Sequence, residues 1–424
     1  MSFDSKNINV YGNNDKELVG QNKPTCFFIV SRVPFPPVGG DKLKYFNMIE
    51  ILKMRYKISM VIISDEKVTP EMKEYLDNSG HEYKIFSYSR LRFKLNAIKA
   101  FFSTLPLQVG YYYFGEVHEY CRKNIKREDF VMANLIRTAL YVQDLPNKKF
   151  IDVADSIYLN YIRSIDRVSS FFWRTVYSIE IKRLQGFEQK CVANFDASLF
   201  ANWSERNYYS DFGRAIWIPN GVSSKLLETN YFRRKKSLFP EVVFFGKMDY
   251  QPNIDAVNWL ISKVLPLVPS LKIRIIGGSP HPKIKALGKR YSNSVVIEGF
   301  VKDPYQAMYD ATAVVAPMQT GGGIQNKILE AMAIGAIVLT TTLGAKAIIG
   351  AVSGEHLIIC DEPQDYATAI MELHNNSKNS IPMGLKAKKL MKESFTWDLY
   401  AKKLYEVLDE ASFNKIEQNN KTAC

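Results

Sequence analysis

The sequence predicts an α/β protein of two doubly wound, Rossmann-like domains that face each other across a cleft. At 424 residues the chain is roughly two to three times the size of an ordinary domain. Short apolar runs rich in β-branched and aromatic residues alternate with stretches of helical spacing, and this alternation occurs in two separate cycles. Strands that alternate with helices predict a parallel sheet in each domain.

The first cycle opens with an expected strand at 25–31, a loop rich in proline and glycine at 32–40, and a helix at 41–54. Asp41 is the expected N-terminal cap of that helix. A strand at 58–64 completes a βαβ unit. The rest of this cycle is expected to contain strands at 130–134, 149–153, 196–201 and 215–218 and a long helix at about 169–193.

The second cycle follows a linker at 223–238, which contains a run of four basic residues at 233–236. Its expected strands are 241–245, 272–276, 295–298, 313–316 and 337–341, and the helices between them include 254–267, 304–309 and 326–334. A helix at 397–411 is expected to pack back across both domains. The predicted divisions are a disordered leader at 1–23, an acceptor domain at 24–222, a donor domain at 223–395 and a C-terminal helix and tail at 396–424.

Composition narrows the function classes. The five cysteines lie far apart and form no metal-binding spacing, so we expect a reducing compartment and no metal site. The leader lacks the apolar core of a secretory signal, and no apolar run reaches the length of a membrane span. We therefore expect a cytoplasmic protein, either free or peripheral at the inner face of the cell membrane. The net charge of +13 would attract phosphates, anionic lipids or nucleic acid, or is simply a basic surface.

The most informative segment is QTGGGIQNKILEAMA at 319–333. Three glycines between a strand and a helix leave backbone N–H groups to face an anion, and the helix N-terminus adds partial positive charge. Lys327 can supply a full charge to a diphosphate, and Glu330, one turn further on, can accept hydrogen bonds from a ribose. The alternative is an ordinary glycine-rich turn before an amphipathic helix.

The longer segment QTGGGIQNKILEAMAIGAIVLTT resembles the donor-binding segment of retaining GT-B glycosyltransferases of family 4. That family often has two glutamates separated by seven residues. Here Glu330 fills the second place and Gly322 stands at the first. The resemblance implies donor contacts from the residues of this loop, which are Gly321, Gly322, Gly323, Ile324 and Asn326.

Two further segments of the second half resemble the same family. VVFFGKMDYQPNIDAVNWL at 242–260 is similar to its first strand and loop, which implies donor contacts from Gly246 and Lys247. The family's second basic residue is replaced by 250–253, so Lys327 is expected to be the second phosphate cation. IEGFVKD at 297–303 resembles the segment that frames the nucleotide base and contains Phe300.

In the first half, RVPFPPVGGDKLKYFNMIEIL resembles the family's glycine loop, which implies ligand contacts at Gly39 and Gly40. ANLIRTALY and IDVADSIYLNY also look like segments of bacterial exopolysaccharide sugar transferases, although Asn134 stands near the place of a common histidine. Arg137 and Asp155 join Asn134 as candidates for acceptor or sugar contacts. A salt bridge or a helix cap is the alternative for Arg137 and Asp155.

The resemblance implies a retaining, metal-independent hexosyltransferase with Lys247, Lys327 and Glu330 as its catalytic residues. Its donor would be a UDP- or GDP-linked sugar with no further cofactor. Its acceptor would be a glycan or lipid-linked molecule in bacterial surface polysaccharide synthesis. The alternatives are a nucleotide-sugar epimerase or hydrolase, and a non-catalytic nucleotide-sugar binding module.

Residues 82–114, in which Lys and Arg alternate with Phe and Tyr, are the least globular-looking part of the first half. Such a composition suits a membrane surface, since aromatic rings lie at the headgroup level and basic residues attract anionic lipid. The alternative is a helix pair with an aromatic core. Single-stranded nucleic acid is a third interpretation, but the sequence has no RNA-binding motif and we expect no nucleic-acid partner.

Overall fold

The computed structural model describes residues 23–421 except 38, 168–170, 233–236 and 377–379, and gives only the backbone at 167, 171 and 411–421. The predicted leader therefore lies almost entirely outside the described residues, as does the basic run at 233–236. The described residues divide into two compact units. The N-terminal domain comprises residues up to Ile218 together with those from Ala401 onward, and the C-terminal domain is Pro219–Tyr400.

The N-terminal domain is built on a seven-stranded sheet in the order β3-β2-β1-β4-β5-β6-β7. Every pairing between these described strands is parallel. The central strands are buried along most of their length, as expected for apolar runs covered on both faces. The strands are β1 (Thr25–Val30), β2 (Lys57–Ser64), β3 (Glu82–Ser87), β4 (Phe130–Asn134), β5 (Lys148–Ala154), β6 (Ala197–Phe200) and β7 (Ala215–Trp217).

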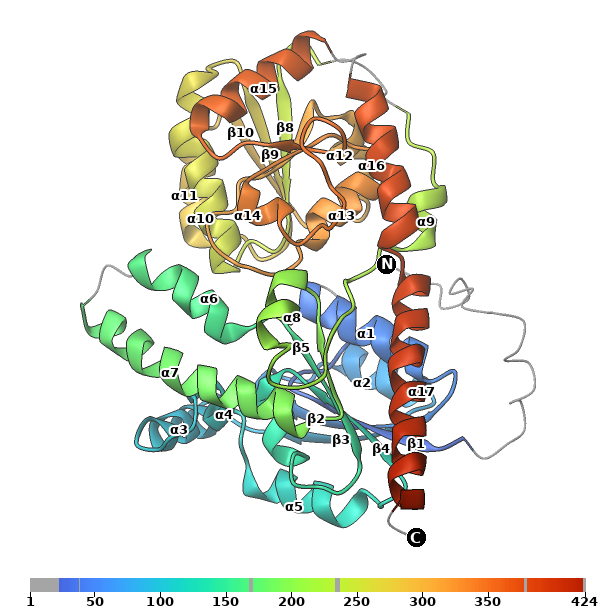
Figure 1. The fold of residues 1–424 in the computed structure, drawn as a ribbon. Helices are drawn as coiled ribbons and strands as arrows, with labels where there is room; N and C mark the ends of the chain where they lie inside the picture. Colours follow the sequence, from blue (N-terminus) through green and yellow to red (C-terminus); the bar gives the residue numbers. More distant parts are fainter. Residues whose placement is uncertain (1–22, 38, 168–170, 233–236, 377–379, 422–424) are drawn as a thin grey trace. The chain divides into compact units, whose positions relative to one another are not determined.

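Helices cover this sheet (Figure 1). They are α1 (Gly40–Leu52), α2 (Pro70–Asn78), α3 (Arg90–Phe101), α4 (Leu107–Tyr111), α5 (Gly115–Asn124), α6 (Ile157–Ser164), α7 (Phe171–Asn194) and α8 (Trp203–Tyr209), with short 3-10 helices at Ile136–Tyr141 and Ile165–Arg167. The predicted cap of α1 is wrong. The N-cap residue is Gly39, and Asp41 lies in the first turn, where it accepts a hydrogen bond from Arg32 at 3.1 Å.

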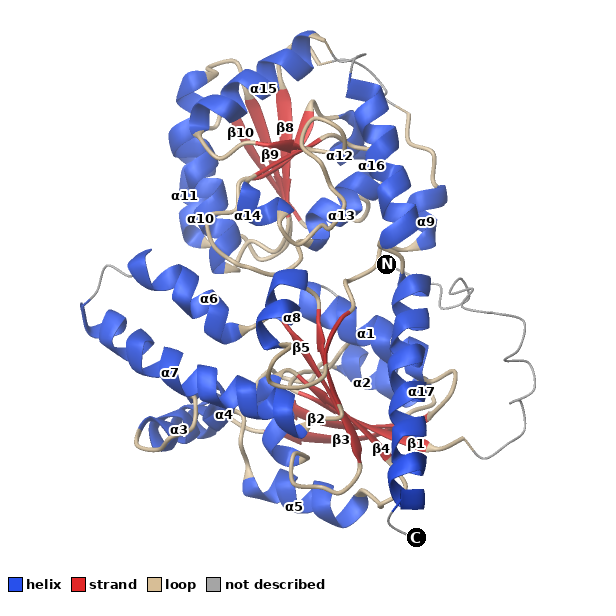
Figure 2. Cartoon of the chain, viewed as in Figure 1, coloured by secondary structure: helices blue, strands red, loops and turns tan. Residues whose placement is uncertain are grey.

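The C-terminal domain has a six-stranded parallel sheet in the order β10-β9-β8-β11-β12-β13 (Figure 2). Its strands are β8 (Glu241–Phe245), β9 (Lys272–Ile276), β10 (Val295–Gly299), β11 (Ala313–Ala316), β12 (Val338–Thr340) and β13 (Ile358–Ile359). Its helices are α9 (Ser224–Glu228), α10 (Gln251–Trp259), α11 (Pro282–Arg290), α12 (Tyr305–Asp310), α13 (Asn326–Ala333), α14 (Thr342–Ala345), α15 (Pro363–Asn375) and α16 (Ile381–Ser394), with a π-helical turn at Leu260–Val264 and a 3-10 helix at Leu265–Leu267.

Both sheets reverse their strand order beside their first strand, at β1/β4 and at β8/β11, which is the Rossmann arrangement. In such sheets ligands bind outside the carboxyl ends of the strands at the point of reversal. The predicted fold class of two Rossmann-like domains is therefore confirmed, and each domain has its own reversal point at which to look for a site.

The last helix, α17 (Trp397–Lys421), belongs to both units. Its first residues lie in the C-terminal domain, and from Ala401 onward it belongs to the N-terminal domain. There Tyr405 donates a hydrogen bond to the carbonyl of Ile51 at 2.5 Å, and Arg55 contacts Asp409 at 3.0 Å. The predicted helix thus continues from one domain into the other.

The basic, aromatic stretch at 82–114 is folded, and the structure confirms the alternative of helices around aromatic core residues. It forms β3, α3 and α4, and the ring of Phe93 is fully buried. Over the parts of the chain that the structure covers, we find no helix with the length and apolar character needed to cross a bilayer.

Candidate functional site

The backbone segments that follow β8 and β9 pack closely against each other at the carboxyl ends of these strands. Gly277 follows β9, and a Cβ atom at this position would lie 1.7 Å from the carbonyl oxygen of Gly246. The N–H of Gly246 donates to Ile276 at 3.0 Å, which ties the two strand ends together. Only glycine fits at position 277. The loop that carries Lys247 is positioned by this contact.

Replacing Gly277 with Ala is therefore expected to destabilise the C-terminal domain by about 1 to 3 kcal/mol, as overpacking does. The thermal unfolding midpoint measures this loss of stability. Nucleotide binding is then measured at a temperature at which the variant is still folded. Gly278→Ala is the matched control, because a Cβ at Gly278 meets nothing within 4 Å. Equal midpoints for the two variants would contradict the tight contact between the strand ends.

The glycine loop between β11 and α13 leads into an uncapped helix. Gly321 has a φ of 90°, a left-handed conformation that favours glycine. Gln325 is the N-cap residue of α13, and it makes no side-chain capping hydrogen bond. The N-terminus of α13 thus keeps its partial positive charge available for an anion. Ile324 is buried behind the loop.

Lys327 is buried in the first turn of α13. Its Nζ donates to Asn253 Oδ1 at 2.5 Å, lies 3.5 Å from Met318 Sδ, and sits 4.7 Å from the centre of the Phe244 ring. Burial lowers the pKa of this amine to about 7. Among the described residues no carboxylate pairs with it. A buried amine without an anionic partner is suited to receive one from a ligand.

Asn253 links the two predicted phosphate cations. Its amide Nδ2 donates to the carbonyl oxygen of Lys247 at 2.8 Å, while its Oδ1 accepts from Lys327. The Lys247 side chain is about half exposed and lies 3.3 Å from Asp249. The structure therefore joins Lys247 and Lys327 through one buried side chain that the sequence did not single out.

Glu330 lies one turn after Lys327 on α13. Tyr305 donates a hydrogen bond to its Oε2 at 3.3 Å. Burial raises the pKa of Glu330 to about 7, and the hydrogen bond from Tyr305 opposes that shift. Two titratable groups perturbed toward neutrality on one short helix are typical of a functional site.

Asn326, the first residue of α13, accepts a hydrogen bond from Asn220 at 2.9 Å. Its own Nδ2 and the Oδ1 of Asn220 are buried and make no hydrogen bond within the described part of the chain. Phe300 is 64% exposed at the end of β10 and Tyr250 is 53% exposed before α10. Exposed rings at strand ends can stack on a nucleotide base.

In the N-terminal domain, Gly39 has a φ of 102° and leads into α1, of which Gly40 is the first residue. Arg32 lies beside this loop and contacts Asp41. Asp41, together with Tyr112 and Glu66, raises the pKa of Arg32 above its ordinary value despite burial. Arg32 therefore stays protonated beside the predicted glycine loop, as one member of an ion pair with Asp41.

Asn134 ends β4 and is fully buried, yet neither polar atom of its side chain has a hydrogen-bond partner among the described residues. The next residue, Leu135, has a φ of 60°, which is a strained conformation for a side chain of this size. Buried polar atoms without partners are rare, and strain gathers at functional sites. Asn134 therefore lies at the reversal point of this sheet in a setting typical of ligand contact.

The end of β5, beside Asn134, is charged. Lys44 pairs with the fully buried Asp152 at 2.6 Å. Burial raises the pKa of Asp155 to about 6, and the positive charge of Lys44 opposes that shift. The Oδ1 of Asp155 is buried without a hydrogen-bond partner among the residues that the structure covers. Arg137 stacks over the Tyr112 ring at 5.0 Å.

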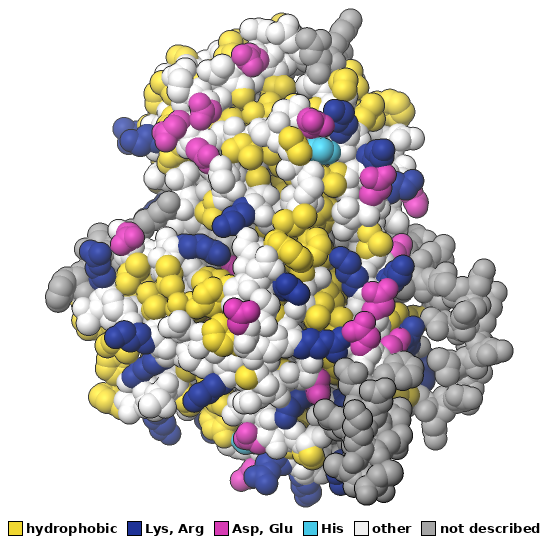
Figure 3. Space-filling view, viewed as in Figure 1, with side chains coloured by type: hydrophobic (Ala, Val, Ile, Leu, Met, Phe, Trp, Pro, Cys, Tyr) yellow, Lys and Arg dark blue, Asp and Glu magenta, His cyan; other side chains and the backbone are white. Residues whose placement is uncertain are grey.

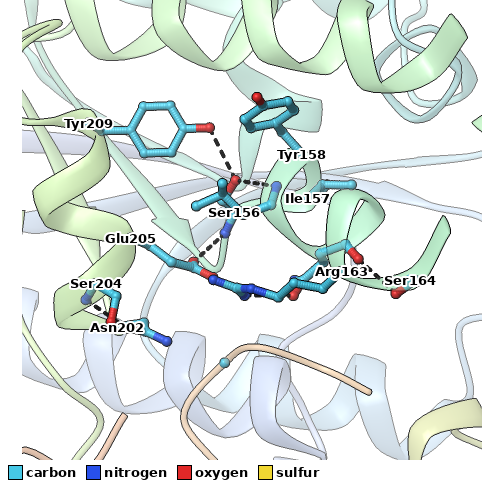
Figure 4. Close-up of polar contacts among 12 residues, drawn as sticks. Ser156, Ile157, Tyr158, Arg163, Ser164, Asn202, Ser204, Glu205 and Tyr209 are labelled. Carbon is cyan, nitrogen blue, oxygen red and sulfur yellow. Dashed lines mark hydrogen bonds and ion pairs between the residues drawn. The ribbon is translucent and has the colours of Figure 1, made fainter. Parts of the chain in front are cut away.

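A second polar group follows Asp155 at the start of α6. The backbone N–H of Ser156 donates to Glu205 at 2.6 Å, and Glu205 pairs with Arg163 at 2.9 Å (Figure 4). Burial raises the pKa of Glu205 to about 8. The fully buried Glu188 accepts four hydrogen bonds, from Ser156 Oγ, Tyr209 Oη and the N–H groups of Ile157 and Tyr158. These groups hold the loop that carries Asp155.

The predicted residues thus gather at the carboxyl end of each sheet. Sequence reasoning missed Lys44, Asn220, Asn253 and Tyr305 and the pair of carboxylates around Ser156. None of these residues belongs to a recognisable motif. Lys44 and Asn253 could have been noticed only as polar residues within an apolar pattern. Within the described residues no three His, Cys, Asp or Glu side chains are grouped as metal ligands, and metal independence stays a prediction.

Part of the C-terminal domain matches a known protein family. Residues 239–376 match the family described as Glycosyl transferases group 1. A Klebsiella pneumoniae protein, described as an uncharacterized 44.6 kDa protein in the cps region, is 23% identical over 376 residues, which are 85% of this chain and 94% of that protein.

Two solved structures are similar in fold over nearly their whole length. Sucrose-phosphate synthase from Thermosynechococcus elongatus has a TM-score of 0.69 at 16% identity, covering 91% of this chain and 98% of its own. Anabaena HepE in complex with UDP-glucose has a TM-score of 0.62 at 14% identity, covering 91% and 99%. The chain therefore has the GT-B fold, and its residues 239–376 match a glycosyl transferases group 1 domain, which together support a glycosyltransferase.

Proposed function

We propose that this protein is a retaining, metal-independent glycosyltransferase of the family 4 type that uses a nucleotide-sugar donor. The observation that carries the proposal is Lys327, a buried amine without a carboxylate partner beside the uncapped N-terminus of α13. A nucleoside diphosphate is negatively charged, and it would supply the anion that both Lys327 and the N-terminus of α13 can bind. The UDP-glucose in the HepE structure supports a UDP-linked donor, with a GDP-linked donor as the other choice.

In this proposal the C-terminal domain binds the donor. Lys327, Lys247 and the N–H groups of 321–324 neutralise the diphosphate as it leaves. One well-placed donor of this kind contributes roughly 2.7 to 4 kcal/mol to the transition state. Glu330 accepts from the ribose, and Phe300 contacts the base.

The N-terminal domain would bind the acceptor at the carboxyl ends of β1, β4 and β5. Asn134, Arg137 and Asp155 offer hydrogen bonds and charge to sugar hydroxyls, and Gly39 and Gly40 allow close backbone approach. The acceptor is a glycan or a lipid-linked molecule. The part of the proposal that concerns bacterial surface polysaccharide rests on the resemblance in sequence.

The deciding experiment compares donor consumption with and without acceptor. Released nucleoside diphosphate is measured with a panel of nucleotide-sugars, first alone and then with glycan acceptors. Turnover that requires the acceptor, with the anomeric configuration kept in the product, supports the proposal. Consumption of donor alone would identify an epimerase or hydrolase. Binding of nucleotide without turnover under any condition would identify a binding module.

The pH dependence of this reaction should report on α13. Since Glu330 has a pKa raised to about 7, it ionises as the pH rises through neutrality, and its ability to accept from a ribose rises with it. Lys327 loses its charge over the same range. We expect kcat/KM to peak near neutral pH, and Glu330→Gln to lower it about tenfold to a hundredfold and to remove the rising limb. A rising limb that survives in Glu330→Gln would assign it to another group.

A further inference from the structure

Helix α3 leaves one apolar side uncovered. Leu91, Leu95, Ile98 and Phe102 follow each other at intervals of four, three and four residues and therefore lie along one face of the helix. All four are exposed, and the largest fractions are 66% for Leu91 and 83% for Phe102. An uncovered stripe of this length on a described helix requires an explanation.

The stripe is not the result of a loosely held helix. On the opposite side of α3, Phe93 is fully buried against the rings of Tyr111, Tyr112 and Phe114. Asn96 donates a hydrogen bond to the carbonyl of Tyr113 at 2.8 Å. The helix is anchored by one face while it presents the other.

The first turn of α7 has exposed apolar side chains as well, on a helix that α3 contacts further along its length. Arg183 of α7 donates to the carbonyl oxygens of Ala100 and Phe101 at 3.5 and 3.0 Å, which places the end of α3 against α7. Phe172 and Trp173, at the start of α7, are more than half exposed. Figure 3 shows hydrophobic side chains and Lys and Arg side by side over α6, α7 and α3.

The charge on α3 itself is positive, although Arg92 pairs with Glu116 at 3.5 Å. From Arg90 to Gly115 the chain contains four basic residues and no acidic one. Arg90, Lys94 and Lys99 of this group are exposed beside the apolar residues. Among the described residues these three make no salt bridge with a carboxylate. An apolar face with basic residues at its border fits the surface of an anionic bilayer, in which charged phosphates lie above the apolar chains.

We propose that the N-terminal domain docks on anionic lipid bilayers through a docking face formed by Leu91, Leu95, Ile98 and Phe102 of and beside α3 together with Phe172 and Trp173 of α7. The apolar side chains enter the headgroup region while Arg90, Lys94 and Lys99 contact lipid phosphates. This goes beyond the proposed function and does not depend on it, since the docking face contains none of the residues assigned to donor or acceptor.

The test is co-sedimentation of the full-length protein with vesicles of phosphatidylcholine alone and of phosphatidylcholine with about one third phosphatidylglycerol. We expect binding to the anionic vesicles that weakens with salt. Leu91→Glu should reduce the partition coefficient at least about tenfold, and Lys94→Glu with Lys99→Glu should do the same, because each basic residue near anionic lipid changes it several-fold.

Matched controls separate the docking face from general surface effects. Leu385→Glu changes an equally exposed leucine on α16, and Lys73→Glu with Lys123→Glu changes two exposed lysines on α2 and α5. Controls that lose as much binding as the test variants would overturn the proposal, as would absence of binding to anionic vesicles. Dimerisation lost in Leu91→Glu would assign the face to a second copy, and binding of single-stranded nucleic acid lost in Lys94→Glu with Lys99→Glu would assign it to nucleic acid; either also overturns it. Nucleotide binding by Leu91→Glu tests the fold independently.

Discussion

Replacing Lys327 with Met should lower kcat/KM for the donor, and affinity for the nucleoside diphosphate, by about a hundredfold to a thousandfold. Methionine keeps the length and the apolar stem of the side chain and removes only the charge. The buried amine contacts an amide, a thioether and an aromatic ring, and none of these neutralises it. Calorimetric titration with UDP and GDP, and initial rates with the preferred donor, measure the two effects.

The same substitution should stabilise the protein without ligand. The pKa of Lys327 is lowered from 10.5 to about 7 in the folded state, so between these values the unfolded chain binds the additional proton. Burying the charged amine of Lys327 therefore lowers the free energy of unfolding by its full amount below pH 7. This loss of stability becomes smaller as the pH rises toward 10.5. Lys327→Met should gain most in melting temperature near pH 6 and little near pH 10. Lys263→Met, at an exposed lysine of the same domain, should change neither binding nor this profile. Unaltered nucleotide affinity in Lys327→Met would end the donor-site assignment.

Replacing Glu188 with Leu should destabilise the N-terminal domain by about 3 to 5 kcal/mol, because each buried donor left without an acceptor costs roughly 1 to 3 kcal/mol. Four donors point at this carboxylate: two hydroxyl groups and two N–H groups of the first turn of α6. Leucine leaves the buried N–H groups of Ile157 and Tyr158 without this acceptor, while the hydroxyls of Ser156 and Tyr209 keep only their contact with each other at 3.1 Å. Because the protein has two domains, unfolding in urea should be followed together with hydrogen exchange of 157–164, which reports on α6 directly.

Glu188→Gln keeps one acceptor oxygen and should cost less than Glu188→Leu. Glu119→Leu, at an exposed glutamate of α5, is the control and should change stability by no more than about 0.5 kcal/mol. Nucleotide binding by the C-terminal domain should persist in all three variants. A small effect of Glu188→Leu would mean that the start of α6 is held by Glu205 alone.

The sequence predicted most strands and helices, but it did not predict the edge strands β3 and β13. β8, β9 and β11 have the predicted bounds, because each is a short apolar run between turn residues. β13 contains two residues, too few to form a pattern. For residues 82–114 the sequence left a membrane surface and a helix pair with an aromatic core both open, because charged and aromatic side chains are dense in either case. Phe93 fills the core, while the neighbouring Leu91 and Leu95 face outward.

The candidate site shows the same limit. The glycine loop, Lys327 and Glu330 are adjacent in sequence, so a motif can identify them together. Asn253 lies 74 residues from Lys327, and Asn220 lies 106 residues from Asn326. Contacts of this range depend on which strands become neighbours, and a single sequence does not encode them in a readable pattern. The roles of the named site residues remain predictions for the experiments above.

The division of α17 between the two units has a consequence for synthesis. Residues 401–410 supply Leu404, Tyr405 and Leu408 to the buried interior of the N-terminal domain. The ribosome makes these residues after the C-terminal domain, and long after the seven strands that they help to cover. A nascent chain released from the exit tunnel as far as Ile218 would still lack this covering, with apolar surface open to aggregation. The N-terminal domain therefore completes its buried interior only after the C-terminal domain has been synthesised.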